Sequence, residues 1–161
     1  MDSKLDEVLN RRRLYEIRFE KVCKGASSVY GLCGKFFLKL LPKKPEAHAL
    51  LTDKKFNEEI TYAPRCLGYR SVARKEFDRF KKKYGIDITL QEDCVHLYVF
   101  ERISFDKIPI LIRRNKGKVI SKEFIKIKLL RPIIHVFNVL YRHGYVYHDV
   151  CWENIVWNTD K

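Results

Sequence analysis

Residues 145–157, YVYHDVCWENIVW, decide the expected fold of this chain. Apolar residues at both ends of the stretch enclose a polar centre that holds Asp149 and Asn154, five residues apart. An acid and an amide between two apolar runs predict a loop that points both side chains at one spot.

The chemistry of this pair is that of a catalytic loop. A carboxylate at Asp149 can accept the proton of an incoming hydroxyl, and the amide oxygen of Asn154 can bind a divalent ion. Phosphoryl transfer needs both groups, so we expect Asp149 to be the catalytic base and Asn154 a catalytic residue that serves as a metal ligand.

The chain before this loop has a helical period. Apolar residues recur at three- and four-residue steps over 124–140, and Arg142-His143-Gly144 closes the predicted helix. Pro132 should kink or break it, and Ser121 is a plausible N-cap. A short apolar segment is expected over 108–112.

The first hundred residues have the pattern of strands. Apolar residues alternate with charged ones from Leu14 until the small residues of 25–28, a second strand opens at Val29 and Tyr30, and residues 36–41 form a third. With a turn over 31–34, these three strands predict an antiparallel meander.

Helices and strands then follow in mixed order. A helix is expected over 46–51, and this helix or a second one over 56–62 must stop by Pro64. Strands are expected over 65–72 and 95–103. The charged stretch between them, residues 74–93, contains Phe77 and Phe80 at a helical spacing and predicts a basic helix. Strands first and helices last predict an α+β protein and argue against a doubly wound sheet.

The loop resembles the catalytic loop of protein kinases, H-R-D-L-x-x-x-N, which also follows a long apolar helix with a His-Gly turn. Tyr147 and His148 stand at the His and Arg positions of that pattern, and residues 153–155 match the E-N-I run of the family. Cys151 stands where protein kinases have a lysine. Small-molecule kinases of the aminoglycoside and choline type share the Asp and Asn without this lysine, so they are the nearest alternative.

A second resemblance lies in the meander. Lys39 ends Phe36-Phe37-Leu38-Lys39 and resembles the V-A-I-K lysine that holds the α- and β-phosphates of ATP. Gly25 and Val29 lie one hairpin upstream, where the family has its glycine-rich lid. Phe37 replaces a small residue against the adenine.

The resemblance also implies a glutamate partner for Lys39 and a hinge. Glu46 is the preferred partner, with Glu58 and Glu59 as alternatives. Phe100 and Glu101 fall where the hinge backbone contacts adenine.

The implied fold is a protein kinase-like α+β domain with an antiparallel small lobe and the beginning of a helical large lobe. Residues 14–103 would form the small lobe and hinge, 104–161 the start of the large lobe, and 1–13 a basic lead-in. The chain ends seven residues after Asn154, before the position of a D-F-G motif, so we expect an incomplete domain whose long helix leaves apolar residues uncovered.

The implied function is binding of ATP and Mg²⁺ and, in a complete domain, transfer of the γ-phosphate to a Ser or Thr hydroxyl of a protein. The alternative is a pseudokinase that holds a protein partner without turnover. A basic nucleic-acid-binding domain is a third possibility without a recognition motif, and we expect no specific nucleic-acid partner.

Composition limits the remaining classes. The 161 residues carry 33 Lys or Arg against 20 Asp or Glu, a formal charge of +13, and 46% are hydrophobic, which excludes wholesale disorder. The apolar runs are too short to span a membrane and no signal peptide is evident, so we expect a soluble cytoplasmic or nuclear protein. The five cysteines form no C-x-x-C and, with the five histidines, no finger-like zinc spacing, so they are expected to be reduced thiols.

Overall fold

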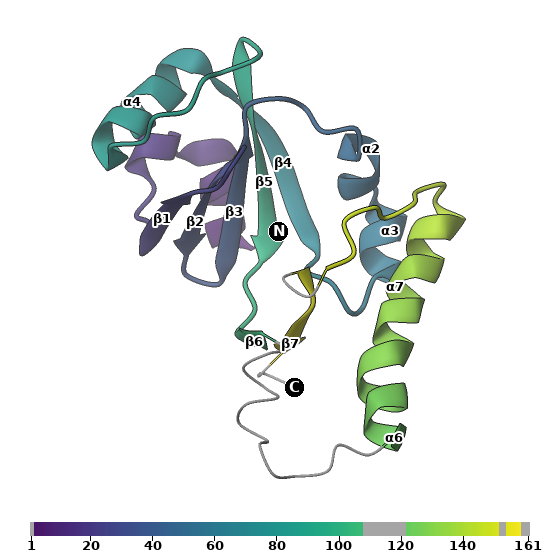
Figure 1. The fold of residues 1–161 in the computed structure, drawn as a ribbon. Helices are drawn as coiled ribbons and strands as arrows, with labels where there is room; N and C mark the ends of the chain where they lie inside the picture. Colours follow the sequence, from purple (N-terminus) through teal and green to yellow (C-terminus); the bar gives the residue numbers. More distant parts are fainter. Residues whose placement is uncertain (1, 108–121, 152–153, 159–161) are drawn as a thin grey trace. The chain divides into compact units, whose positions relative to one another are not determined.

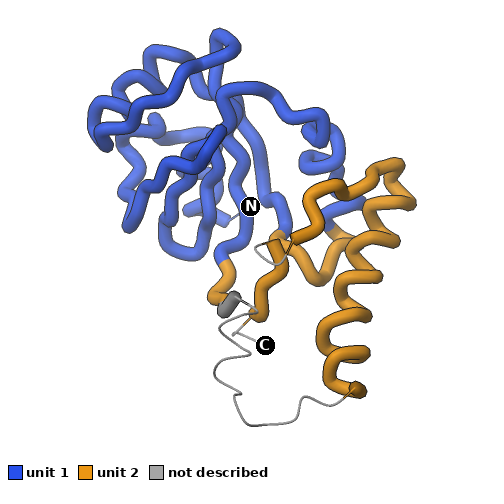
Figure 2. Tube along the Cα trace, viewed as in Figure 1, with its two compact units in different colours: residues 1–57, 65–102 blue, residues 58–64, 103–161 orange. Residues whose placement is uncertain are grey.

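The computed structural model describes residues 2–107, 122–151 and 154–158 (Figure 1). The chain forms two compact units (Figure 2). Unit 1 comprises residues 1–57 and 65–102, and unit 2 comprises residues 58–64 and 103–161.

Unit 1 is built on a five-stranded sheet in the order β1-β2-β3-β5-β4. All neighbouring strands in it are antiparallel. The strands are β1 (Lys21–Lys24), β2 (Val29–Cys33), β3 (Phe36–Leu41), β4 (Cys66–Ala73) and β5 (Cys94–Glu101). The mixed α+β class and the predicted meander of the first three strands are therefore confirmed.

Six helical segments belong wholly or partly to unit 1. They are α1 (Ser3–Asp6), the π-helix η1 (Glu7–Arg11), the 3₁₀-helix η2 (Leu14–Glu16), α2 (His48–Leu51), α3 (Lys54–Glu59) and α4 (Arg74–Tyr84). The helix expected over 46–51 is shorter than predicted, and the basic helix with Phe77 and Phe80 is present as α4.

The core of unit 1 lies on one face of the sheet. Phe77 and Phe80 of α4 pack there with Leu14 and Ile17 from the N-terminal segment, and each of the four is at most 3% exposed. The strand expected from Leu14 is wrong, because residues 14–16 form η2 and β1 begins only at Lys21. The apolar residues from Leu14 onward therefore belong to a segment that packs on one face of the sheet, and not to an additional strand.

Gly31 lies inside β2, although a turn was expected over 31–34. A Cβ atom at Gly31 would lie 2.5 Å from the ring of Phe19, so the missing side chain leaves room for that ring. The turn itself is made by Gly34, whose φ of 56° is the left-handed conformation that favours glycine.

The described part of unit 2 contains a long helical segment and a two-stranded ribbon. The helical segment contains α6 (Lys122–Phe124), the π-helix η3 (Ile125–Leu130) and α7 (Arg131–Arg142), and β6 (Phe105–Lys107) pairs antiparallel with β7 (Val156–Asn158). Pro132 lies in the first turn of α7, where π-type hydrogen bonding gives way to α-type. The backbone stays helical through Leu130 and Arg131, so the expected break is absent. The predicted cap Ser121 and the apolar segment over 108–112 lie outside the described residues.

One side of α7 packs on the segment 58–64 of the same unit. His143 Nε2 lies 3.2 Å from Glu59 Oε2, and His135 Nε2 lies 3.2 Å from Thr61 Oγ1. Large apolar side chains elsewhere on the helical segment are exposed, namely Ile125, Ile127, Leu130, Ile134, Phe137 and Tyr141. Within the described residues, no helix combines the length and the hydropathy needed to cross a membrane.

Candidate functional site

The predicted catalytic pair lies together in unit 2. Asn154 Nδ2 donates hydrogen bonds to Asp149 Oδ2 and to the Asp149 backbone oxygen, each at 3.0 Å. Both residues are exposed, so solvent and small ligands can reach the carboxylate. A carboxylate beside a carboxamide offers the oxygen ligands that Mg²⁺ prefers.

Structured elements hold both ends of this loop. At its start, Gly144 ends α7 with a φ of 80°, and the Tyr145 N–H donates to the Leu140 oxygen at 3.0 Å. At its end, Trp157 in β7 stacks on Phe124 with ring centroids 5.5 Å apart. The loop that carries Asp149 and Asn154 is therefore anchored by α7 at its start and by the β6–β7 ribbon at its end.

Two residues that depart from the kinase pattern, Cys151 and Tyr147, interact with the Asp149 carboxylate. The Cys151 thiol lies 3.9 Å from Asp149 Oδ1, where the pattern has a cationic side chain. Partial burial, together with the negative charge of Asp149, raises the pKa of the Tyr147 hydroxyl. Tyr147 therefore stays a neutral phenol near the acid.

Lys39 lies in unit 1 on the face of the sheet opposite the core. Strand register puts Tyr30, Lys39, Tyr98 and Tyr69 in one row across β2, β3, β5 and β4. Paired residues in antiparallel strands share a face, so a partly exposed ammonium group stands between aromatic side chains. Among the described residues, no carboxylate lies within 4.0 Å of this ammonium group.

The candidate glutamate partners lie in different places. Glu46 is exposed in the turn before α2 rather than on the helix. Glu58 and Glu59 end α3, and the Glu59 carboxylate contacts His143 and Arg142 at the end of α7. The structure brings none of the three into an ion pair with Lys39.

The other predicted nucleotide contacts are divided between the two faces of the sheet. Phe100 pairs with Phe37 on the face that carries Lys39. Val29 is fully buried on the core face, so the residue of β2 that adjoins Lys39 is Tyr30. Gly25 opens the β1–β2 turn with a hydrogen bond to the Ser28 oxygen, and Glu101 ends β5 with its N–H bound to the Arg65 oxygen.

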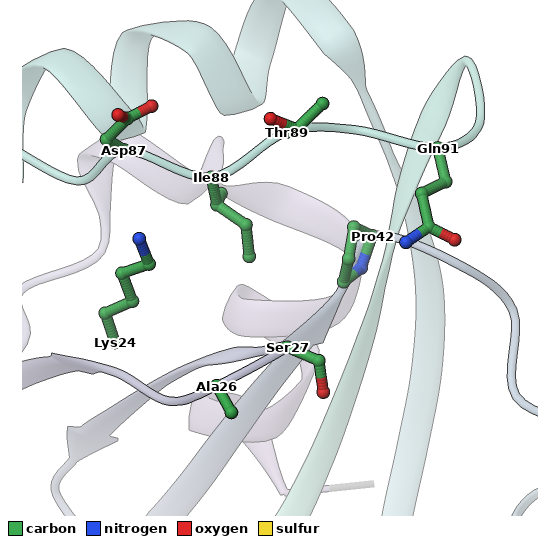
Figure 3. A pocket seen from close by; sticks show the side chains of 8 residues that line it. All are labelled: Lys24, Ala26, Ser27, Pro42, Asp87, Ile88, Thr89 and Gln91. Carbon is green, nitrogen blue, oxygen red and sulfur yellow. The ribbon is translucent and has the colours of Figure 1, made fainter.

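A hollow of about 310 Å³ lies beside the β1–β2 turn of unit 1. Figure 3 shows Ala26 and Ser27 of the turn below it and the loop after α4 above it. Lys24 enters it from the strand position paired with Val29, hence from the core face. The hollow and the face that carries Lys39 are therefore different sites.

A chain of polar aromatic contacts on the Lys39 face was not predicted. His48 Nδ1 of α2 lies 2.6 Å from the hydroxyl of Tyr98, which is fully buried. Beside them, the Tyr69 hydroxyl lies 2.8 Å from His96 Nδ1, and His96 Nε2 lies 2.6 Å from Glu92 Oε2. The sequence pattern that could have predicted these contacts is the alternation of Cys94, His96 and Tyr98 with aliphatic residues in β5.

Comparisons of the chain with known proteins identify no similar protein. The chain matches no family model, no curated protein and no solved structure.

Proposed function

We propose that this chain is a protein kinase-like domain that binds ATP with Mg²⁺. Asp149 would act as the base toward a Ser or Thr hydroxyl of a protein, and Asn154 would be the magnesium ligand. The observation that carries the proposal is the pair of 3.0 Å hydrogen bonds that joins Asn154 to Asp149 in a loop directly after a long helix. Positioning of this kind, with charge neutralisation by the metal, supplies most of the catalysis in phosphoryl transfer.

Unit 1 supports the nucleotide half of the proposal. Lys39 lies on the third strand of the sheet, the strand that carries the phosphate-binding lysine in protein kinases. Lys39 would contact the α- and β-phosphates, with Gly25 in the turn of the lid hairpin and Phe100 and Glu101 at the hinge.

Binding without turnover is the second candidate function. Lys39 lacks an ion-paired glutamate among the described residues, although in active protein kinases the equivalent lysine pairs with one. Phe37 lies between Tyr30 and Phe100, with ring centroids 5.8 Å and 6.3 Å away, and crowds the face where adenine would lie. These two observations favour a pseudokinase that holds a protein partner.

Nucleotide binding is tested first, by the thermal shift and calorimetry of the chain with ATP and Mg²⁺. Lys39→Ala should weaken binding about 10-fold or more, the cost of a lost charge-assisted contact. The matched control is Lys21→Ala, which removes an exposed lysine of β1 and should bind ATP as the wild type does. If ATP does not bind, or if Lys39→Ala binds it unchanged, the assignment of Lys39 is wrong.

Turnover is tested with γ-labelled ATP. Asp149→Asn should abolish transfer to a Ser/Thr peptide library while leaving ATP affinity intact, and the exposed Asp93→Asn should change neither. Transfer to an aminoglycoside or to choline would instead indicate a small-molecule kinase.

ATP binding without any transfer would support the pseudokinase. Binding to mixed oligonucleotides with a steep salt dependence would favour a nucleic-acid-binding domain.

A further inference from the structure

Three side chains with metal-binding atoms gather at the start of β5. Cys94 and His96 are alternate residues of β5 and therefore lie on one face, and Glu92 lies in the bend just before the strand. One ligand atom from each lies within 4.8 Å of the other two. This spacing differs from that of finger-like zinc motifs, so the cluster becomes visible only with β5 in place.

The distances within the cluster are close to those of a tetrahedral metal site. Cys94 Sγ lies 3.8 Å from His96 Nε2. Tetrahedral zinc, with bonds of about 2.3 Å to sulfur and about 2.0 Å to nitrogen, separates such atoms by about 3.6 Å. His96 Nε2 and Glu92 Oε2 are 2.6 Å apart in a hydrogen bond, and this pair would have to open to about 3.3 Å around an ion.

His96 is already oriented as a ligand. The side chain is almost fully buried, with only 4% exposed, and its ring stacks on Tyr69 at an interplanar angle of 12°. The Tyr69 hydroxyl lies 2.8 Å from Nδ1 and can accept a proton from it, while Nε2 faces Glu92 and Cys94. Without an ion, a proton lies between Nε2 and the Glu92 carboxylate in their hydrogen bond, and a bound ion would take the place of that proton. Metal-binding histidines commonly have such a partner on the other ring nitrogen.

We propose that Glu92, Cys94 and His96 bind one Zn²⁺ ion, with a fourth position for water. A thiolate, an imidazole and a carboxylate suit zinc and not Mg²⁺, so this site differs from the magnesium ligand proposed at Asn154. Binding replaces the thiol proton of Cys94 with a metal–sulfur bond and the proton between His96 Nε2 and Glu92 with bonds to the metal. The thiol proton passes to solvent, and the imidazole proton passes to Nδ1 or to solvent. Partly exposed Glu92 provides the side from which the ion enters.

A bound ion would also fix the segment after β3. The Glu92 Oε1 atom accepts the Lys44 N–H at 3.1 Å, while Oε2 faces His96. A metal on Oε2 therefore connects the start of β5 with the chain leading to α2. We expect zinc to raise the melting temperature of the protein, because a ligand bound only to the folded state stabilises it.

The test titrates the full chain, first freed of metal with a chelator, with Co²⁺ and then with Zn²⁺. The wild type should bind one ion, show the thiolate-to-Co²⁺ charge-transfer absorbance, lose it when Zn²⁺ displaces Co²⁺, and melt at a higher temperature with Zn²⁺. Cys94→Ser should lose the absorbance and weaken Zn²⁺ binding at least about 10-fold. The matched control is Cys23→Ser in β1, which should behave as the wild type.

The opposite results would overturn the site. Absence of metal binding at micromolar Zn²⁺ would leave Glu92 and His96 as a plain hydrogen-bonded pair. Binding that survives Cys94→Ser would place the ion elsewhere. Because Cys94→Ser conserves size and Cys94 is only partly buried, the variant should fold, and its melting curve without metal verifies this.

Discussion

Asn154 uses one amide group to hold two atoms of Asp149, the carboxylate Oδ2 and the backbone oxygen, both at 3.0 Å. One side chain therefore restrains both the backbone and the carboxylate of Asp149. A carboxylate held in this way keeps one orientation, which the proposed base needs.

Removal of this contact should therefore affect phosphoryl transfer more than folding. We expect Asn154→Ala to lower the transfer rate at least about 10-fold and to raise the Mg²⁺ concentration required, because the orienting group and the proposed ligand are lost together. The measurement is the initial rate as a function of Mg²⁺. The exposed Asn138→Ala on α7 is the control, and an unchanged rate in Asn154→Ala would remove Asn154 from the mechanism.

Buried Glu76 should be the main polar determinant of stability in unit 1. Its carboxylate accepts the Leu14 N–H at 2.6 Å and lies 3.1 Å from Arg70 Nη2. Glu76→Ala should lower the free energy of unfolding by about 3 kcal/mol, because it leaves Arg70 without its partner and releases the N-terminal segment. Chemical denaturation measures this loss.

The control for Glu76 lies on the same helix. Asp78 is exposed and contacts Lys81 at 3.5 Å, so Asp78→Asn should change the free energy of unfolding by no more than about 0.5 kcal/mol. Equal effects of the two variants would show that the buried carboxylate has no special role.

His48 should make the stability of unit 1 depend on pH. Partial burial, with smaller contributions from Lys44 and His96, lowers the pKa of His48 below its ordinary 6.5. The unfolded chain then binds the proton more readily, so the stability contributed by neutral His48 is complete above pH 6.5 and is lost as the pH falls through the lowered value.

The measurement is the melting temperature between about pH 7.5 and pH 5. His48→Gln should reduce the slope. Tyr98→Phe should also reduce it, because the Tyr98 hydroxyl is the hydrogen-bond partner of His48 Nδ1 and protonation of the imidazole makes Nδ1 a donor only. A slope that persists in both variants would assign the pH dependence to another group.

The two sides of α7 should respond differently to substitution. Val139 is fully buried, so Val139→Ala should cost about 1 to 3 kcal/mol of unfolding free energy. Ile134 is 54% exposed, so Ile134→Gln should leave stability nearly unchanged while reducing self-association and binding of an apolar dye. Denaturation and light scattering measure the two effects, and a destabilised Ile134→Gln would show that this side is covered in solution.

Local sequence patterns predicted most elements of the fold. The strand over 36–41 is an apolar run interrupted only by Lys39, and the basic helix has Phe77 and Phe80 at a helical spacing. Tyr15, Ile17 and Phe19 alternate with charged residues without forming a strand, because the buried carboxylate of Glu76 holds the start of this segment through the N–H of Leu14, sixty-two residues away. Such long-range contacts leave no local pattern.

In the candidate site too, contacts between residues close in sequence could be predicted, and contacts between distant residues could not. Asp149 and Asn154 are close in sequence, and the predicted loop does bring them together. The pairing of Tyr69 with His96 and of His48 with Tyr98 depends on which strands are neighbours, and a single sequence does not specify this. The roles proposed for Lys39 and Asp149 remain predictions for the experiments above.

Strand β5 has aliphatic side chains on its core face, and on the other face it carries His96 and Tyr98, whose side chains form hydrogen bonds. Leu97 and Val99 meet only a requirement of volume, so conservative exchanges among aliphatic residues should be tolerated there during evolution. His96 and Tyr98 each need a partner on another element, so a change in either should be accompanied by a change in Tyr69 or His48. Among descendants of this gene, residues on the core face of β5 should therefore be replaced one at a time. Residues on the opposite face should be replaced together with their hydrogen-bond partners, and hence more slowly.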